Sequence, residues 1–472
     1  MENINIREYN WRCNYHFNPP FGLINDPNGL CYYNGYYYIF FQWYPYGCKH
    51  GLKHWGLIKT KDFINYSKPE IVLIPDSWFD RDGCYSGSSI VKDGKIQVLY
   101  TGNVRKEDGS RLSYQCLATI DEKGELKKHG PVVENIPQGY TSHFRDPKVF
   151  FYNDKYYFII GAQSDSLKGR VLLYSSVDFK NWEMEGEIET ELEDFGYMWE
   201  CPNYVNIDDK DILIFSPQGL EEEFRFQNTY QSGYIIGKFN IEDTKFFHGE
   251  FKELDKGFDF YAPQILKDHK GRTIMIGWMG MADEEEKLHP TIDEGWIHSL
   301  TMARELVLDN GELYQRPLEE MKKLRKEEFS VEDIVFDNWK DEKVSGYSYE
   351  LLLVLEKYKS EGFEIKLSLG NNEYISLKYD FIENIIILDR NNMSYGPKGI
   401  RKIKLDKKDS IKLHIFMDKS ALEIYIDDGR EVMSSRIFPK EGSKNVEILS
   451  KGGQGNIKKL RFWPLQGVKY NG

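Results

Sequence analysis

The chain has 472 residues and carries 62 Lys and Arg against 75 Asp and Glu, a formal net charge of −13. An acidic chain without a basic block argues against nucleic acid or an anionic membrane surface as the main partner. The composition is 40% hydrophobic and 15% aromatic, which excludes disorder as the dominant state and favours half-buried strands.

The N-terminal segment 1–10 contains no apolar stretch, and no run in the chain approaches the length that a bilayer requires. We therefore expect no secretory signal and a cytoplasmic protein. The six cysteines form no CxxC pair and have no metal-ligand spacing, so reduced thiols and no metal site are expected. No cofactor is expected either.

Five segments of the first 300 residues share one plan, in which two apolar strands flank a tight turn. The turns are rich in Asn, Asp and Gly, the residues that two-residue hairpin turns require. The segments begin about 55 to 62 residues apart. They are Pro27 to Phe41, Ser86 to Tyr100, Pro147 to Ile160, Pro202 to Phe215 and Pro263 to Trp278.

A repeated hairpin unit of this length can form a four-stranded sheet with one extended loop. Five such units predict a five-bladed β-propeller, in which radial repetition protects the sheet edges. The alternative is an irregular β-sandwich whose hairpins arise by chance. We predict that the propeller covers residues 1–316.

The pattern changes after Arg316-Pro317. A charged segment at 317–333 has apolar residues at three-residue spacing and predicts a helical linker. Alternating strands follow, as in Ile411 to Phe416, and predict an antiparallel β-sandwich over 334–472. The predicted fold is therefore all-β, a five-bladed β-propeller followed by a C-terminal β-sandwich.

Three acidic residues lie at similar places in three of the repeats. Asp26 precedes Pro27, Asp146 precedes Pro147, and Glu200 lies two residues before Pro202. The first strand of each propeller blade lines the central channel, so we expect these acids to meet at one mouth of it. The alternative is that they only cap loops.

Converging carboxylates repel one another, so at least one is expected to have a raised pKa and to stay protonated near neutral pH. An anionic nucleophile beside a proton donor is what cleavage of a glycosidic bond requires. Trp199 is expected to favour the neutral form of Glu200 by burial, and the polar turn around Asp26 to keep that residue ionised. Three carboxylates could also bind Ca²⁺, but the chain has no EF-hand-like loop.

At these residues the sequence resembles glycoside hydrolase family 32, the invertase-like β-fructofuranosidases, and within it the bacterial enzymes that act on sucrose 6-phosphate. The likeness extends over nearly the whole chain in the expected order. The matching segments include Asn25-Asp26-Pro27-Asn28-Gly29, His54-Trp55-Gly56, Tyr85-Ser86-Gly87-Ser88, Phe144-Arg145-Asp146-Pro147, Trp199-Glu200-Cys201-Pro202, Tyr261-Ala262-Pro263-Gln264 and Asp418 to Tyr425.

The resemblance implies a propeller followed by a β-sandwich and a reaction that retains configuration through a covalent intermediate. It implies that Asp26 is the nucleophile, Glu200 the general acid/base and Asp146 a stabiliser of the transition state. Retention would place the first two carboxyl groups about 5–5.5 Å apart. The residues implied to shape the fructose pocket are Asn25, Gln42, Trp55, Ser86, Gly87, Arg145 and Tyr261.

Several of these residues also have simpler interpretations. Trp55 could fill a blade core, Gln42 could bind backbone groups, and Arg145 could serve only as the ion-pair partner of Asp146. Leu23-Ile24 stands where the family often has a Trp-containing pair, which affects inferences about the pocket rim.

The sequence therefore predicts a retaining β-fructofuranosidase that hydrolyses sucrose or sucrose 6-phosphate. The expected partner is a small sugar, and the chain is expected to be a monomer or homodimer. One alternative is an exo-acting hydrolase of levan or inulin, and another is a catalytically silent sugar-binding propeller. Residues considered for holding a phosphate are Lys49, His50, Lys53, Lys168 and Arg170, which ordinary solvated charge explains equally well.

Overall fold

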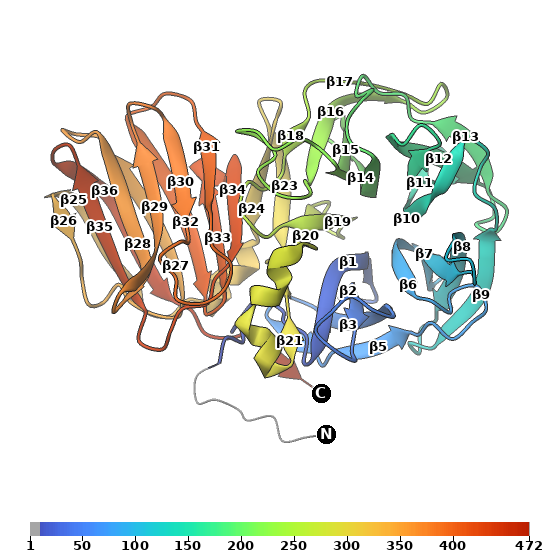
Figure 1. The fold of residues 1–472 in the computed structure, drawn as a ribbon, viewed down its shortest axis with the longest axis horizontal. Coiled ribbons are helices and arrows are strands. Elements are labelled where there is room, and N and C mark those ends of the chain that lie inside the picture. The colour runs from blue at the N-terminus through green and yellow to red at the C-terminus, as the bar shows by residue number, and fades with distance from the viewer. Residues whose placement is uncertain (1–9, 472) are drawn as a thin grey trace.

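A computed structural model of the chain describes residues 10–471, and almost all of its regular elements are β-strands. Figure 1 shows two parts, a ring of sheets coloured from blue to yellow and a stack of orange and red strands beside it. Segment 1–9, part of the region in which no secretory signal is predicted, lies outside the described residues. Within residues 10–471, no helix has both the length and the apolar character needed to span a bilayer.

The ring consists of five largely antiparallel sheets that follow one another along the chain. The first contains β1 (Gly22–Tyr33), β2 (Tyr36–Tyr44), β3 (His54–Thr60), β4 (Asn65–Ser67), β5 (Glu70–Leu73), β21 (Trp296–Ile297) and β37 (Lys469–Asn471). The second contains β6 (Cys84–Lys92), β7 (Lys95–Arg105), β8 (Arg111–Ile120) and β9 (Leu126–Val133). The third contains β10 (Tyr140–Tyr152), β11 (Lys155–Ser164), β12 (Gly169–Ser176) and β13 (Glu183–Glu187).

The other two sheets complete the ring. The fourth contains β14 (Met198–Ile207), β15 (Lys210–Gln218), β16 (Gly233–Asn240), β17 (Lys245–His248) and β18 (Lys252–Glu253). The fifth contains β19 (Tyr261–Lys267), β20 (Thr273–Met279), β22 (Ser299–Leu300), β23 (Arg304–Asp309) and β24 (Glu312–Pro317). Two short 3₁₀ helices, η1 (Glu284–Leu288) and η2 (Pro290–Glu294), precede β21.

All five predicted hairpins are present, as β1–β2, β6–β7, β10–β11, β14–β15 and β19–β20. Their turn residues explain why. Asn34 and Gly35 both have positive φ, 49° and 81°, and the Asn or Asp residues of the next three turns do as well. Asn, Asp and Gly adopt this conformation at low cost, and its twist matches that of the flanking strands.

The first strands of the sheets form a closed ring, because β1 contacts β6 and β19 while β10 contacts β6 and β14, and β14 contacts β19. At the closure, β21 pairs in parallel with the start of β1, joining Trp296 to Gly22. The predicted propeller is confirmed, and the number of five blades stays a prediction that this ring of five sheets supports.

The second part is the predicted β-sandwich, which is confirmed. One six-stranded sheet contains β25 (Phe329–Phe336), β27 (Ser348–Glu356), β32 (Ser410–Asp418), β33 (Ala421–Ile426), β34 (Glu431–Arg436) and β36 (Gly455–Pro464). The other contains β26 (Asn338–Trp339), β28 (Gly362–Gly370), β29 (Glu373–Asp380), β30 (Ile385–Asp389), β31 (Ile400–Lys404) and β35 (Asn445–Lys451). A short 3₁₀ helix, η4 (Asp427–Gly429), links β33 to β34.

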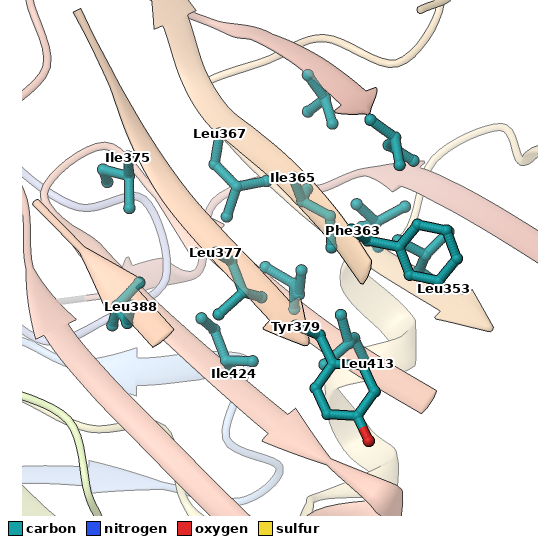
Figure 2. Close-up of a cluster of buried hydrophobic side chains, with 14 of the residues drawn as sticks. Leu353, Phe363, Ile365, Leu367, Ile375, Leu377, Tyr379, Leu388, Leu413 and Ile424 are labelled. Atoms are coloured by element: carbon teal, nitrogen blue, oxygen red, sulfur yellow. The ribbon is translucent and has the colours of Figure 1, made fainter. Parts of the chain in front are cut away.

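Alternating side chains of the two sheets meet in one apolar core. Leu351, Leu353 and Leu355 on β27 are buried, as the period-two pattern of a strand requires. Figure 2 shows Leu353 beside Phe363 of the opposite sheet, and Ile365 and Leu377 belong to the same cluster. This core lies almost entirely within the sandwich.

The boundary between the two parts differs in detail from the predicted one. A short 3₁₀ helix, η3 (Glu319–Leu324), occupies part of the predicted linker, with Met321 and Leu324 buried as the spacing indicated. Strand β25 then begins at Phe329, before the predicted linker end at 333, and β37 returns to pair with β4 of the propeller. The predicted domain limits stay a prediction, and the final strand ties the C-terminal end to the first blade.

Candidate active site

The three predicted acids lie in one cavity of about 630 Å³, which the initial residues of β1, β6, β10, β14 and β19 line together with loops. Because these strands form the inner ring, the cavity occupies one mouth of the propeller channel. The predicted site residues that line it are Asn25, Asp26, Gln42, Ser86, Arg145, Asp146, Glu200 and Tyr261.

Each inner strand has an irregular register at the place where it meets the cavity. The breaks fall between Ile24/Pro27, Cys84/Gly87, Arg145/Lys148, Glu200/Asn203 and Tyr261/Gln264. A β-bulge bends its strand and redirects the side chains beside it. The same device in all five strands therefore turns side chains toward one point.

The bulges correct one detail of the sequence interpretation. The acids were expected at equivalent repeat positions, but Glu200 precedes its bulge, Asp146 is the first residue inside it, and Asp26 the second. In a regular strand neighbouring positions point to opposite faces, and only the bulges allow all three to reach the cavity. Asp146 also has a positive φ of 71°, a strained conformation of the kind that gathers at functional sites.

Asp26 is buried between donors and other acids. Ser86 Oγ donates to its Oδ2, Asn25 Nδ2 donates to its Oδ1 over 3.2 Å, and the Cys201 thiol lies 3.8 Å from Oδ2. Burial raises the pKa of Asp26, the charge of Glu200 acts in the same direction, and the Ser86 hydroxyl opposes them. The donors hold the carboxylate in one orientation, as a nucleophile requires.

Glu200 accepts four hydrogen bonds. Arg145 donates to Oε1 from Nε (2.8 Å) and Nη2 (2.6 Å), while Gln218 (2.8 Å) and the Tyr261 hydroxyl (2.6 Å) donate to Oε2. The simpler interpretation that Arg145 serves only as the ion-pair partner of Asp146 is wrong, because its ion pair is formed with Glu200. The Trp199 ring stacks on Phe215, with 4.3 Å between the ring centroids.

Asp146 completes the cluster through Cys201. The Cys201 amide donates to Asp146 Oδ2 (3.1 Å), and the Thr101 hydroxyl accepts from the Asp146 amide (3.1 Å). Burial raises the pKa of Asp146 to about 7, and the charges of Glu200 and Asp26 add to this effect against Arg145. The expectation that one acid has a raised pKa therefore agrees with the geometry.

Cys201 stands at the centre of the three acids, being adjacent to Glu200 and in contact with Asp26 and Asp146. Burial raises the pKa of its thiol well above the usual range, which agrees with a packing role rather than a reactive one.

A chain of polar contacts supports the site from the first blade. Asn25 Nδ2 donates to Gln42 Oε1 (2.6 Å), and Lys53 Nζ donates to Asn25 Oδ1 (2.7 Å). Lys53 Nζ also lies 3.0 Å from His50 Nδ1, whose Nε2 lies 3.1 Å from Glu286 Oε1. This chain fixes the Asn25 amide beside Asp26.

Two predicted pocket residues lie outside the cavity lining. The Trp55 ring is buried near Phe40 and Tyr100, and its Nε1 donates to the Tyr85 carbonyl (3.0 Å). A Cβ added at Gly87 would lie 2.1 Å from the Leu99 carbonyl, so this position has no room for a side chain. Both residues support the cavity wall from behind, and direct substrate contact by them stays a prediction.

Sequence reasoning missed several residues of the cavity. Gln218 and Trp278 lie near the ends of β15 and β20, and Tyr85, Arg105 and Asp82 come from the second blade. Gln218 pairs with Met198, which lies two residues before Glu200. Counting the same number of residues along both strands from the β14–β15 turn would therefore have placed Gln218 near the acid. The loop residues carry no comparable signal.

The described residues contain one group that could offer three ligand atoms to a metal. Atoms of Cys13, His16 and Asp418 lie within 4.8 Å of one another. Both His16 ring nitrogens are already hydrogen-bonded, Nδ1 to Asp418 (3.1 Å) and Nε2 to Glu423 (3.0 Å). Hydrogen bonds therefore account for this group, which lies between propeller and sandwich.

Known proteins share both parts of this chain. Residues 16–317 match the family described as glycosyl hydrolases family 32 N-terminal domain, and residues 320–464 match the glycosyl hydrolases family 32 C terminal. The sucrose-6-phosphate hydrolase of Bacillus subtilis (strain 168) is 43% identical, covering 93% of this chain and 92% of that protein. The one from Staphylococcus xylosus is 38% identical, covering 98% and 94%.

Solved structures show the same fold over nearly the whole chain. The sucrose-6-phosphate hydrolase of Lactobacillus gasseri superposes with a TM-score of 0.90 at 32% identity, covering 97% of this chain and 94% of that one. A GH32 beta-fructofuranosidase of Bombyx mori superposes with a TM-score of 0.85 at 31% identity, covering 98% and 95%. The family expected from the motifs is thereby confirmed, and the chain belongs to glycosyl hydrolase family 32.

Proposed function

We propose that this protein is a retaining β-fructofuranosidase that hydrolyses sucrose or sucrose 6-phosphate to fructose and glucose or glucose 6-phosphate. The observation that carries the proposal is the convergence of Asp26, Asp146 and Glu200 around Cys201 in one cavity. The printed functions of the Bacillus and Staphylococcus relatives support the substrate class.

In the first step, an Asp26 oxygen forms a bond to the anomeric carbon of the fructosyl group. The bond from that carbon to the glucosyl oxygen breaks, and Glu200 gives a proton to the departing oxygen. Three acids in one buried site retain at least one proton near neutral pH.

In the second step, water attacks the same carbon of the fructosyl-enzyme, and Glu200 accepts the proton of that water. Two displacements at one centre restore the original configuration. Arg145 donates twice to Glu200 Oε1 and so fixes the orientation of this carboxyl group. Tyr261 and Gln218 hold the other oxygen of Glu200.

The remaining predicted residues position the sugar. Asp146 accepts hydrogen bonds from fructose hydroxyl groups, and these bonds strengthen as positive charge develops on the ring. Asn25 and Gln42, linked to each other by a 2.6 Å hydrogen bond, and Ser86 complete the polar wall.

We place the reaction in the cytoplasm, with the protein acting as a monomer or homodimer. All six cysteines are free thiols, which agrees with a reducing compartment.

Initial rates on sucrose, sucrose 6-phosphate, inulin and levan test the proposal under one condition. Fructose release from either disaccharide is the expected result, and added methanol should yield methyl β-fructofuranoside by capture of the intermediate. Preference for levan or inulin would favour the fructan-hydrolase alternative. Sugar binding without any fructose release would overturn the assignment.

A further inference from the structure

One wall of the active-site cavity carries cationic side chains that the mechanism leaves unused. Lys53 and Arg105 line the cavity on the side of the first two blades, together with Tyr85. Arg111 lies beside them, with its guanidinium 5.6 Å from the centre of the Tyr85 ring. We call these three basic residues the cationic wall.

Lys53 is the buried member of the cationic wall. Its ammonium group has three N–H donors, of which Asn25 Oδ1 (2.7 Å) and His50 Nδ1 (3.0 Å) account for two. Among residues 10–471, no carboxylate lies within ion-pair distance of its Nζ. Burial lowers the pKa of Lys53 to about 8, so its charge is poorly compensated inside the protein. A nearby anion would stabilise that charge.

The two arginines form the outer part of the wall. The Arg105 amide donates to Asp82 Oδ2 (2.7 Å), which fixes the backbone at the end of β7. Within the described part of the chain, the guanidinium groups of Arg105 and Arg111 form no hydrogen bond or ion pair. Their planar forks are therefore free to bind oxygen atoms of a ligand.

The other basic residues considered for this role are already engaged or lie elsewhere. Lys168 pairs with Asp194 (2.5 Å) and Arg170 with Glu187 (2.9 Å) in the third blade. Lys49 does not line this cavity and borders a neighbouring one. Arg145 is held by Glu200. Lys53 and Arg105 line the same cavity as the three acids, and the guanidinium groups of Arg105 and Arg111 have no hydrogen-bond or ion-pair partner among the described residues.

The charge of the cavity explains what these donors are for. Three carboxylates repel any anion, and a neutral sugar needs no cation to offset them. A phosphorylated substrate carries a charge close to −2 and needs opposing positive charge where its phosphate lies. We propose that Lys53, Arg105 and Arg111 bind the phosphate of the substrate's leaving group, so that the enzyme selects phosphorylated disaccharide over sucrose. This inference rests on the proposed function.

The test compares kcat/KM for sucrose 6-phosphate and for sucrose in Arg105→Gln, Arg111→Gln and the double variant. Each single change should lower kcat/KM for the phosphorylated substrate about 10- to 100-fold, and the double change further. The loss on sucrose should be less than about threefold. Lys106→Gln, which removes an exposed charge from the same hairpin outside the cavity, should leave the ratio unchanged.

Equal losses of kcat/KM on both substrates, or an unchanged ratio of the two kcat/KM values in the double variant, would show that the cationic wall does not bind the phosphate. Fructose release in the same assays would still support the proposed function. If the wild-type chain released fructose from neither substrate, the proposed function would fail. Calorimetry with glucose 6-phosphate against glucose would then decide separately. Tighter binding of glucose 6-phosphate than of glucose, lost in the double variant, would support phosphate binding by the cationic wall. Equal affinities for the two sugars in the wild-type chain would refute it.

Discussion

Two buried groups of carboxylates in this protein have opposite charge balances. In the cavity, burial and mutual repulsion raise the pKa of Asp26 and Asp146, and the ion pair of Arg145 is formed with Glu200. Between propeller and sandwich, Asp418 and Glu423 lie around His16, and Arg304 contacts Glu423 at 2.7 Å. We call these four residues the interface network.

The interface network compensates its charges. Burial would raise the pKa of Glu423, but Arg304 and His16 hold it at about 2, and His16 also lowers the pKa of Asp418. Asp255, which contacts Arg304 as well, keeps a raised pKa because burial outweighs its contacts.

The carboxylates of the interface network have cationic partners and connect the two domains, whereas Asp26 and Asp146 have raised pKa values and, within residues 10–471, only Glu200 of the three predicted acids is ion-paired. The difference separates structural acids from catalytic ones, although both groups come from distant parts of the chain.

The largest expected effect is the loss of turnover in Asp26→Asn. Removing the proposed nucleophile should lower kcat about 10⁴-fold or more, since the amide that replaces the carboxylate cannot form the covalent bond. The fold should survive, because the amide keeps the size of the carboxyl group and relieves repulsion. Ser86→Ala, which removes a donor to Asp26 and one hydroxyl group of the cavity wall, should lower kcat about 10- to 100-fold. Retention of more than a hundredth of wild-type kcat in Asp26→Asn would remove it as nucleophile.

The next effect is on stability. Arg304→Met leaves Glu423 and Asp255 without their shared cation and should lower the free energy of unfolding by about 3–5 kcal/mol. Urea titration measures it. Arg430→Met is the matched control, because Arg430 also bridges sandwich and propeller through Glu312 but its side chain is 38% exposed. A loss below about 1 kcal/mol is expected there. Equal losses of stability in the two variants would mean that the burial of Arg304 and its carboxylate partners does not set the interface network apart from an exposed ion pair.

The sequence allowed the hairpins and the acids to be predicted, because both depend on local chemistry. Asn34-Gly35 requires a tight turn wherever the chain goes, and an acid at the start of an inner strand reaches the channel mouth. The offset of Asp26, Asp146 and Glu200 within their bulges could not be predicted, since a bulge becomes visible only in the pairing register.

Side-chain contacts between different blades could not be predicted from the sequence either. Arg145 and Asp146 are neighbours in sequence, but the bulge and the positive φ of Asp146 turn the carboxylate toward the Cys201 amide, while Arg145 reaches Glu200 on the next blade. Lys53 is one of many loop lysines in the sequence, and only the fold places its ammonium beside Asn25.

A smaller effect follows from uncompensated charge in the cavity. The folded-state pKa of Asp146, about 7, lies above its ordinary value of 3.8, so ionisation works against folding as the pH rises. Asp146→Asn should therefore stabilise the protein by about 1–2 kcal/mol at pH 8 and by little at pH 4, while activity falls. Thermal unfolding at both pH values measures the difference. A variant that is less stable than wild type at pH 8 would contradict an uncompensated Asp146.

The smallest expected effect concerns the charge of His16 in the interface network. Burial lowers the pKa of His16, but hydrogen bonds to Asp418 and Glu423 outweigh it and raise the pKa above 6.5. The stability that protonated His16 contributes is therefore complete below about pH 6.5 and is lost as the pH rises through the raised value. His16→Gln should be less stable than wild type, and the difference in the free energy of unfolding should shrink toward alkaline pH.

This trend differs from that of Asp146→Asn, whose advantage grows with pH, because His16 supplies the charge that the cavity acids lack. Unfolding measured for both variants from pH 5 to 9 compares them directly. A margin for His16→Gln that stays constant across this range would show that His16 acts as a neutral hydrogen-bonding group. Charge compensation in the interface network would then rest on Arg304 alone, and Asp418 would need another explanation for its lowered pKa.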